Sequence, residues 1–522
     1  MNKPLIAGIA LYLGLVGVLL MASLALTGGS FTFAQDDPYI HLAMARTLAE
    51  HGVWGIAPDA FASASSSPLW TLLLTALWTL GAKAVWVPFV LNLTAGFAAL
   101  AVADRMLGAL APRDRFAVLA AVVVATPLPT LAFVGMEHTL QVLLVLLFAW
   151  QVSQRLAESR SDWLWPTVIA GLLVATRYEG LFLVAIASAM LLWRRQRVAA
   201  LSLAVAAGVP VVLFALYSVS HGGLILPNSV LMKSVPGRFE TFASGFSAIA
   251  SEWLSVRDLF LRPPQLALTV AALVGLLLTP YERVASLQRP AWLAMLFVAA
   301  SVLHASLVKI EWFYRYEAYL MALGVVAVVS LGATAILPRA AQRRRSHPLH
   351  PAATALAILL AIPLGVRALQ SLAVTPRATK NVFEQQVQLG RFFSRHYPGR
   401  PIAVNDIGAI AWLSSSRILD IVGLASQPVA DLKRRKALDA AEMDRLTKEV
   451  DAIAIYANIF EPIVPGSWVK VGEWTITDVV GVSGETVTFF APDAPRAARL
   501  DAALRDDASE LPPGVRARLF TP

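Results

Sequence analysis

Long apolar segments are the feature that most constrains this chain. Nine stretches approach the length of a membrane-spanning helix, which needs about 20 mainly apolar residues. They are residues 5–26, 86–103, 116–134, 139–153, 198–217, 266–280, 291–308, 318–337 and 352–373. Only 15% of the 522 residues are charged, whereas a soluble domain carries about a quarter. The sequence therefore predicts a polytopic α-helical membrane protein.

Shorter apolar segments add to this pattern. Residues 163–175 and 181–193 flank the polar motif Thr176–Gly180, which is typical of a re-entrant pair lining a cavity. Residues 68–80 are also apolar. We expect about 11 spans. The orientation of residues 68–80 leaves one crossing unexplained, so this segment either dips into the membrane and returns, or a neighbouring assignment is wrong.

Basic residues orient the predicted spans. The chain has a net charge of +9, and the 18 basic and 18 acidic residues from Thr375 onward balance, so the excess lies in the membrane half. Clusters such as Arg194, Arg195 and Arg197 are expected in cytoplasmic loops. We read residues 5–26 as an uncleaved first helix with the N-terminus inside, and the protein as residing in a bacterial cytoplasmic membrane. No basic stripe interleaved with aromatic residues indicates nucleic-acid binding.

The C-terminal region has a different composition. Residues 378–522 predict an extracytoplasmic α/β domain, and residues 1–374 a transmembrane bundle with external loops. Residues 381–395 are expected to form an amphipathic helix, followed by strands at 401–405, 418–422, 452–456, 468–480 and 486–491. The absence of cysteine excludes disulfides and thiolate catalysis.

Paired carboxylates directly follow the first apolar segment, in the motif Asp36-Asp37-Pro38-Tyr39. One could act as a general base on an incoming hydroxyl, and both could hold a divalent cation. The alternative is that Asp37 caps a helix beginning at Pro38. On that basis we expect Asp36 to be the base, with Asp37 orienting it. His41 lies one helical turn further on.

Other polar residues fall in loops predicted on the same side of the membrane. Each has a structural alternative: a helix start, an ion pair, a solvated lysine, an aromatic membrane anchor or a strand-end turn. As a group they predict one cavity for an anionic lipid-linked substrate, with a nucleophile activated beside it. The candidates for donor phosphate or substrate binding are His41, Glu137, His138, Arg177, Glu179, Asn228, Lys233 and Arg315, and those for acceptor contact are Asn405 and Asp406.

The order of these motifs resembles the GT-C superfamily of membrane glycosyltransferases. The resemblance is strongest to the branch that contains the mycobacterial terminal arabinofuranosyltransferases. It is carried by Asp36–Tyr39, Ser66–Trp70, Gly135–Glu137, Thr176–Gly180, Pro227–Asn228 with Lys233, Asn405–Gly408 and Asp420–Leu424.

The resemblance implies an inverting hexosyl- or pentosyltransferase that acts at the outer membrane face. Its donor would be a polyprenyl-phosphate sugar, its acceptor a hydroxyl of an envelope glycan, lipid or protein, and its base Asp36 or Asp37. His138 and Tyr178 depart from the family pattern, which leaves the sugar and the acceptor open. A membrane transporter and a lipid-linked glycan ligase remain alternatives.

Overall fold

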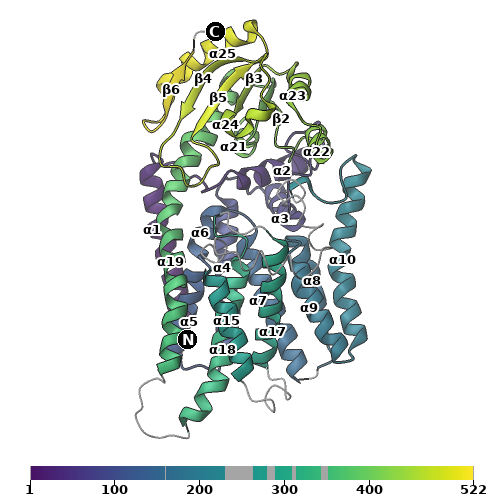
Figure 1. The fold of residues 1–522 in the computed structure, drawn as a ribbon, viewed down its shortest axis with the longest axis vertical. Coiled ribbons are helices and arrows are strands. Elements are labelled where there is room, and N and C mark those ends of the chain that lie inside the picture. Colours follow the sequence, from purple (N-terminus) through teal and green to yellow (C-terminus); the bar gives the residue numbers. More distant parts are fainter. Residues whose placement is uncertain are drawn as a thin grey trace.

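The protein is elongated, with a helical bundle at one end and a smaller mixed domain at the other (Figure 1). The computed structural model describes residues 2–158, 160–229, 263–278, 289–308, 313–341 and 351–520. A bundle of apolar helices joined to a C-terminal domain with a mixed sheet confirms the predicted fold class.

Apolar helices form the bundle. Six described helices have the length and hydropathy to cross a membrane: α1 (Lys3–Leu26), α4 (Val87–Met106), α5 with α6 (Pro112–Val134), α7 (His138–Glu158), α10 (Arg197–Ser220) and α17 (Arg289–Leu307). Beside them run α8 (Leu164–Thr176), α9 (Gly180–Trp193), α15 (Pro263–Leu278), α18 (Ala318–Ala341) and α19 (Pro351–Val382) (Figure 1). The expected number of about 11 spans stays a prediction.

Two helices lie outside this arrangement. Helices α2 (Asp37–His51) and α3 (Pro68–Thr79) are found between the bundle and the C-terminal domain (Figure 1). With 12 residues, α3 is about 18 Å long, too short for a hydrocarbon core of about 30 Å. If α3 does not cross the membrane, the crossing that the sequence left unexplained disappears.

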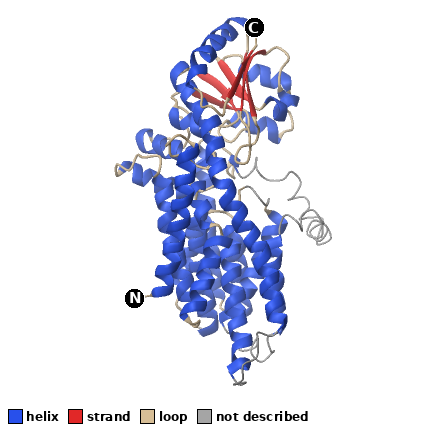
Figure 2. Ribbon diagram, turned by 90° about the vertical axis from the view of Figure 1, so that its left-hand side faces the viewer, coloured by secondary structure: helices blue, strands red, loops and turns tan. Residues whose placement is uncertain are grey.

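A nearly continuous helix joins the two parts of the molecule (Figure 2). Helix α19 runs from the bundle into a π-helical turn, η1 (Phe383–Val387), and continues as α20 (Gln388–His396). The domain boundary predicted near residues 374–378 thus falls inside a helix. The connection has no irregular linker, so the orientation of the domain is fixed by helical backbone.

The C-terminal domain is built on a six-stranded sheet with the order β2-β1-β3-β5-β4-β6. Strands β1 (Pro401–Val404), β2 (Arg417–Asp420) and β3 (Ala452–Ile455) are parallel. Strands β4 (Val469–Thr475), β5 (Thr486–Ala491) and β6 (Arg516–Leu519) are antiparallel. The surrounding helices are α21 (Gly408–Leu413), α22 (Gln427–Arg434), α23 (Ala440–Thr447), α24 (Ala457–Phe460) and α25 (Ala494–Asp507), with 3₁₀ turns at Glu461–Ile463 and Ala508–Glu510.

Aromatic packing anchors the continuous helix to the sheet. The ring of Phe392 on α20 lies 5.5 Å from that of Trp474 and 5.6 Å from that of Phe489. All three side chains are buried. These rings close the core of the domain around the helix that emerges from the bundle.

Helix α21 docks the domain onto α2 at both of its ends. The Asp36 carboxylate accepts hydrogen bonds from the backbone N–H groups of Gly408 (2.6 Å) and Ala409 (2.8 Å). At the other end, the Arg46 guanidinium donates to the carbonyls of Ala411 (2.7 Å) and Trp412 (3.0 Å). Oxygen acceptors thus meet the unpaired N–H groups at the start of α21, and a cation meets the carbonyls at its end.

The docking contact leaves no room for a side chain at Gly408. A Cβ there would lie 2.1 Å from the Asp36 carbonyl oxygen. We therefore predict that Gly408→Ala lowers the apparent melting temperature, as expected for an overpacking cost of about 1–3 kcal/mol. The melting temperature is measured by tryptophan fluorescence of the protein in detergent. Gly466→Ala is the control, because a Cβ there meets nothing within 4 Å; equal melting of the two variants would contradict a tight docking contact.

Candidate functional site

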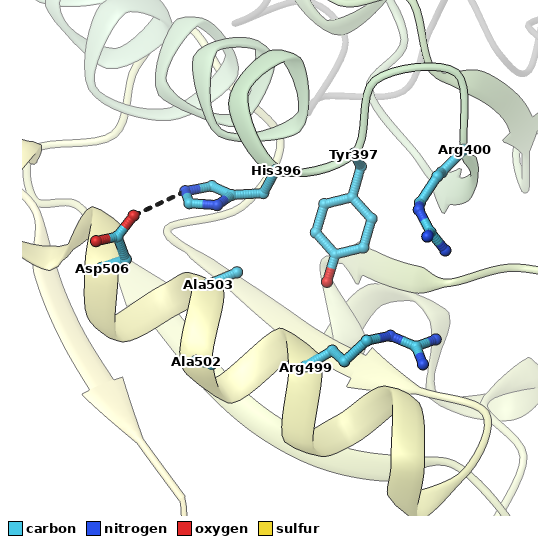
Figure 3. A pocket seen from close by; sticks show the side chains of 7 residues that line it. All are labelled: His396, Tyr397, Arg400, Arg499, Ala502, Ala503 and Asp506. Carbon is cyan, nitrogen blue, oxygen red and sulfur yellow. Dashed lines mark ion pairs between the residues drawn. The ribbon is translucent and has the colours of Figure 1, made fainter.

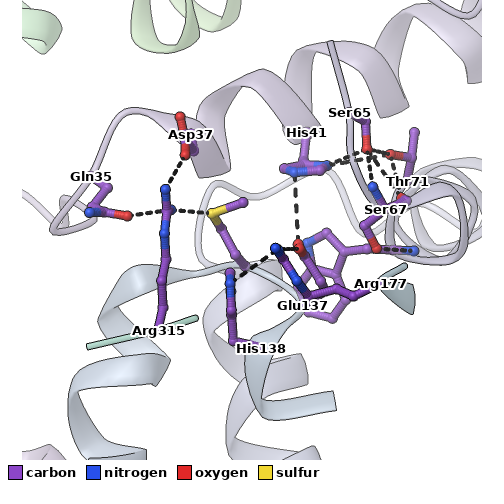
Figure 4. Close-up of polar contacts among 12 residues, drawn as sticks. Gln35, Asp37, His41, Ser65, Ser67, Thr71, Glu137, His138, Arg177 and Arg315 are labelled. Atoms are coloured by element: carbon purple, nitrogen blue, oxygen red, sulfur yellow. Dashed lines mark hydrogen bonds and ion pairs between the residues drawn. The ribbon is translucent and has the colours of Figure 1, made fainter. Parts of the chain in front are cut away.

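Arg177 lies at the centre of a buried polar cluster at the domain-facing end of the bundle (Figure 4). It occupies the break between α8 and α9 and donates to Glu137 Oε1 at 2.7 Å. It also bonds both Glu179 oxygens, at 2.7 and 3.1 Å, and approaches His138 Nε2 at 3.2 Å. Two carboxylates thus surround one guanidinium, so Arg177 brings no excess positive charge for an anion.

His41 connects this cluster to α2 and α3. Its Nε2 lies 3.9 Å from Glu137 Oε2, and its Nδ1 lies 3.3 Å from the hydroxyls of both Ser65 and Thr71 (Figure 4). All of these side chains are buried. The imidazole therefore joins α2 and the segment before α3 to the start of α7.

Arg315 joins the Asp37 carboxylate to the same cluster. Its guanidinium donates to Asp37 Oδ2 at 2.8 Å and to the Gln35 side-chain oxygen, and it contacts Met136 Sδ at 2.7 Å. The Tyr316 ring lies between the two cations, 5.1 Å from Arg315 and 5.4 Å from Arg177. We call this set the polar network: Gln35, Asp37, His41, Glu137, His138, Arg177, Glu179, Arg315 and Tyr316.

The loop that carries Arg315 is itself fixed by Arg367 of α19. Arg367 forms an ion pair with Glu317 at 2.5 Å and donates to the Tyr314 carbonyl at 2.9 Å and the Ala125 carbonyl at 3.1 Å. Sequence reasoning missed Arg367, Gln35 and Tyr316. Arg367 could have been found, because it interrupts the apolar segment 352–373, and a cation inside such a segment marks a specific partner.

Asp36 faces the C-terminal domain, whereas Asp37 faces the network. Helix α2 begins at Asp37, with Asp36 at the N-cap position and no capping hydrogen bond from the Asp36 side chain. The expectation that Asp36 is left free is wrong. Both Asp36 oxygens instead accept N–H groups of α21. Burial, reinforced by the nearby negative charge of Asp406, raises the pKa of Asp36 to about 8.

The two candidate acceptor contacts are held within the domain. The Asn405 side-chain oxygen accepts from the backbone N–H of Tyr456 at 2.9 Å, which ties the end of β1 to the end of β3. The Asp406 carboxylate accepts from the Tyr456 hydroxyl at 2.5 Å and from Gln386 of the π-helical turn at 2.8 Å. Burial raises the pKa of Asp406 as well. An acceptor contact at these residues stays a prediction.

A further candidate, Asn228, lies shortly after the end of α10. The Asn228 amide donates to the Gln427 side-chain oxygen on α22 at 3.2 Å, which places Asn228 against the domain. Lys233 lies outside the described residues. Lys233 apart, the structure brings together Asp37, Glu137, Arg177 and Arg315, whereas Asp36 faces the C-terminal domain. One cavity that joins all of these residues stays a prediction.

Metal ligands do not gather in the part of the chain that the structure describes. No group of three or more His, Asp or Glu side chains comes together there in a way that could hold an ion. A divalent cation at Asp36 and Asp37 stays a prediction. It would compete with the α21 N–H groups and with Arg315 for the carboxylate oxygens.

Residues 380–490 match a family model described as a domain of unknown function (DUF8728). No curated protein matches the chain. Among solved structures, it is similar to ArnT from Cupriavidus metallidurans in the apo state, with 13% identity and a TM-score of 0.48, covering 93% of this chain and 98% of that one.

The chain is also similar to the oligosaccharyltransferase AglB from Archaeoglobus fulgidus in complex with an inhibitory peptide and a dolichol-phosphate. The identity is 10% and the TM-score 0.44, with 94% of this chain and 77% of that one covered. These scores are below those that establish a common fold, so the function has to be argued from the site.

The raised pKa of Asp36 predicts a pH-dependent stability. The folded protein keeps this proton up to about pH 8, whereas the unfolded chain releases it near pH 4. Stability is therefore fully present below about pH 4 and falls as pH rises toward 8. The decrease in melting temperature between pH 5 and pH 8 should be smaller in Asp36→Asn. An unchanged decrease, matching that of the exposed control Asp59→Asn, would show that Asp36 ionises normally.

The Arg367–Glu317 pair predicts a second effect on stability. Arg367→Met leaves Glu317 buried without its partner, which typically costs about 3–5 kcal/mol. Adding Glu317→Gln should recover part of the loss in melting temperature. The control is Arg377→Met on the same helix, where the pair with Asp478 is exposed and should contribute little. Similar melting temperatures of Arg367→Met and Arg377→Met would show that the Arg367–Glu317 pair does not stabilise the protein.

Proposed function

We propose that the chain is an inverting glycosyltransferase of the GT-C type. It would move a sugar from a polyprenyl-phosphate donor to a hydroxyl of a cell-envelope acceptor, at the outer face of the cytoplasmic membrane. The observation that supports this most is the polar network, in which separate segments of the bundle and its loops bring three carboxylates, two guanidinium groups and two imidazoles together at one end of the bundle. Carboxylates can act as a general base, and a guanidinium group is suited to binding a phosphate.

The distribution of basic residues supports this orientation. Arg194, Arg195 and Arg197 lie at the turn between α9 and α10, at the end of the bundle far from the C-terminal domain (Figure 1). Arg105, Arg113 and Arg115 lie at the turn between α4 and α5. Loops rich in Lys and Arg are retained in the cytoplasm, which leaves the network and the domain on the outside.

The proposed reaction is a single displacement at the anomeric carbon. The acceptor oxygen forms a bond to that carbon, while the bond from the carbon to the phosphate oxygen breaks. The hydroxyl proton passes to a carboxylate, and the electron pair leaves with the polyprenyl phosphate. Since a phosphate is a good leaving group, catalysis requires mainly a base, positioning and stabilisation of the phosphate charge.

We assign the base to Asp37 in preference to Asp36. Both Asp36 oxygens are engaged by α21, so a proton transfer there would disturb the docking of the domain. Asp37 instead contacts Arg315 inside the network. Asp36 then acts as a positioning residue that holds the first loop against the domain.

Donor binding and base activation would be linked through Arg315. The donor phosphate competes with Asp37 for this guanidinium, and a carboxylate released from an ion pair accepts a proton more readily. Gln35 offers a further donor, because its amide nitrogen is buried and has no hydrogen-bond acceptor among the described residues. Arg177, held by Glu137 and Glu179, would keep the surrounding loops in place.

Turnover of labelled donor tests the proposal. Purified protein is supplied with polyprenyl-phosphate hexose or pentose and an envelope extract as acceptor. Asp37→Asn should lower the rate by about 10²–10⁴-fold, and Asp36→Asn by less. Arg315→Lys should also be slow, because lysine lacks the planar fork. Arg445→Ala, an exposed residue on α23, should leave the rate unchanged.

Other results would favour the alternatives. Full activity of correctly folded Asp37→Asn and Asp36→Asn would remove the mechanistic basis of the proposal. Movement of a solute across proteoliposomes without cleavage of any donor would indicate a transporter. Turnover of a diphosphate-linked oligosaccharide, with no turnover of monophosphate donors, would indicate a ligase.

A further inference from the structure

A pocket of about 350 Å³ lies in the C-terminal domain, between the end of α20 and one face of α25 (Figure 3). Its walls come from His396, Tyr397 and Arg400 on one side. On the other side are Arg499, Ala502, Ala503 and Asp506, whose spacing places them on one face of the helix. Helix α25 is at the end of the molecule far from the bundle (Figure 1), so this pocket is separate from the polar network.

Positive charge gathers at one end of the pocket. The Asp451 carboxylate binds Arg400 at 3.1 Å and Arg499 at 3.1 Å, and Arg496 lies 3.6 Å away. One carboxylate therefore holds the guanidinium groups of Arg400 and Arg499 in place, while Arg496 is also paired with Asp493. Arg400 and Arg499 each use one nitrogen for Asp451 and have no other hydrogen-bond acceptor within the described ranges, which leaves pre-positioned N–H groups for an anion.

The rest of the lining suits a sugar ring. Figure 3 shows the Tyr397 hydroxyl pointing toward α25, with the Tyr397 ring between His396 and Arg400. Ala502 and Ala503 offer only methyl groups, which can contact the C–H face of a pyranose. At the far end, Asp506 lies 3.9 Å from His396 Nε2 and is exposed, so it can accept hydrogen bonds from sugar hydroxyls.

We propose that this pocket binds an anionic sugar unit, carrying a carboxylate or a phosphate, in a glycan chain. Arg400 and Arg499 recognise the anionic group, and the Ala502 and Ala503 methyl groups, with the partly exposed His396, receive the ring. Its volume is near the lower end of the range for small-ligand sites, which fits one unit of a polymer and not a large ligand. A role for the pocket in holding the acceptor rests on the proposed function. The pocket would bind one unit of a polymeric glycan acceptor while another unit of the same glycan reaches Asp37.

Direct binding tests the pocket without any turnover. Full-length protein in detergent is titrated calorimetrically with tetragalacturonic acid, with glucose 6-phosphate and with neutral maltotetraose. At least one anionic probe should bind, and maltotetraose should bind at least about 10-fold more weakly. The anionic probe that binds identifies the group as a carboxylate or a phosphate. Binding of neither probe, or equal binding of maltotetraose, would overturn the proposal.

Variants separate this site from the transfer site. Arg400→Ala combined with Arg499→Ala should weaken binding at least about 10-fold. Ala502→Trp, which fills the pocket at an exposed helix position without changing charge, should do the same. Arg445→Ala is the matched control and should bind normally. Asp37→Asn should also bind normally, so failure of the proposed function and failure of this site are distinguishable. Unchanged binding by Ala502→Trp would place the ligand elsewhere.

Discussion

The contact between the Asp36 carboxylate and the first two N–H groups of α21 is the interaction on which the rest of the site depends. Asp36 directly precedes the residue that enters the polar network, so holding Asp36 against the domain also fixes the direction of Asp37. Arg46 secures the other end of α21. The loop after α1 therefore has its position defined by residues that lie 372 positions further along the chain.

The continuous helix made of α19, η1 and α20 supports this arrangement through contacts with both the C-terminal domain and the bundle. The α19–η1–α20 helix carries the domain directly from the bundle, and its π-helical turn places Gln385 and Gln386 against Tyr456 and Asp406. π-Helical turns often occur at functional sites. On the bundle side, Arg367 of the same helix binds Glu317 and the Tyr314 carbonyl, which holds the loop that carries Arg315. One helix thus aligns the domain side and the bundle side of the site.

The sequence predicted the fold class and most members of the network, and its errors have physical reasons. Apolar length, charge distribution and alternating strand patterns are local signals, so the bundle and the mixed sheet could be predicted. The roles of Asp36 and Asp37 could not, because α21, the partner of Asp36, is distant in the sequence. A capping rule based on Pro38 alone therefore left Asp36 free, whereas both of its oxygens accept hydrogen bonds from α21. Arg367 was overlooked because it was counted as part of an apolar span.

The central claim is that a lipid-linked donor is bound and cleaved at the polar network. An experimental structure of the protein with a non-hydrolysable polyprenyl-phosphate sugar tests this most directly. The account predicts that the phosphate lies within hydrogen-bonding distance of Arg315, with the Asp37 carboxylate released from that guanidinium and facing the anomeric carbon. A donor phosphate bound at the opposite end of the bundle, with the Asp37–Arg315 pair intact, would contradict it.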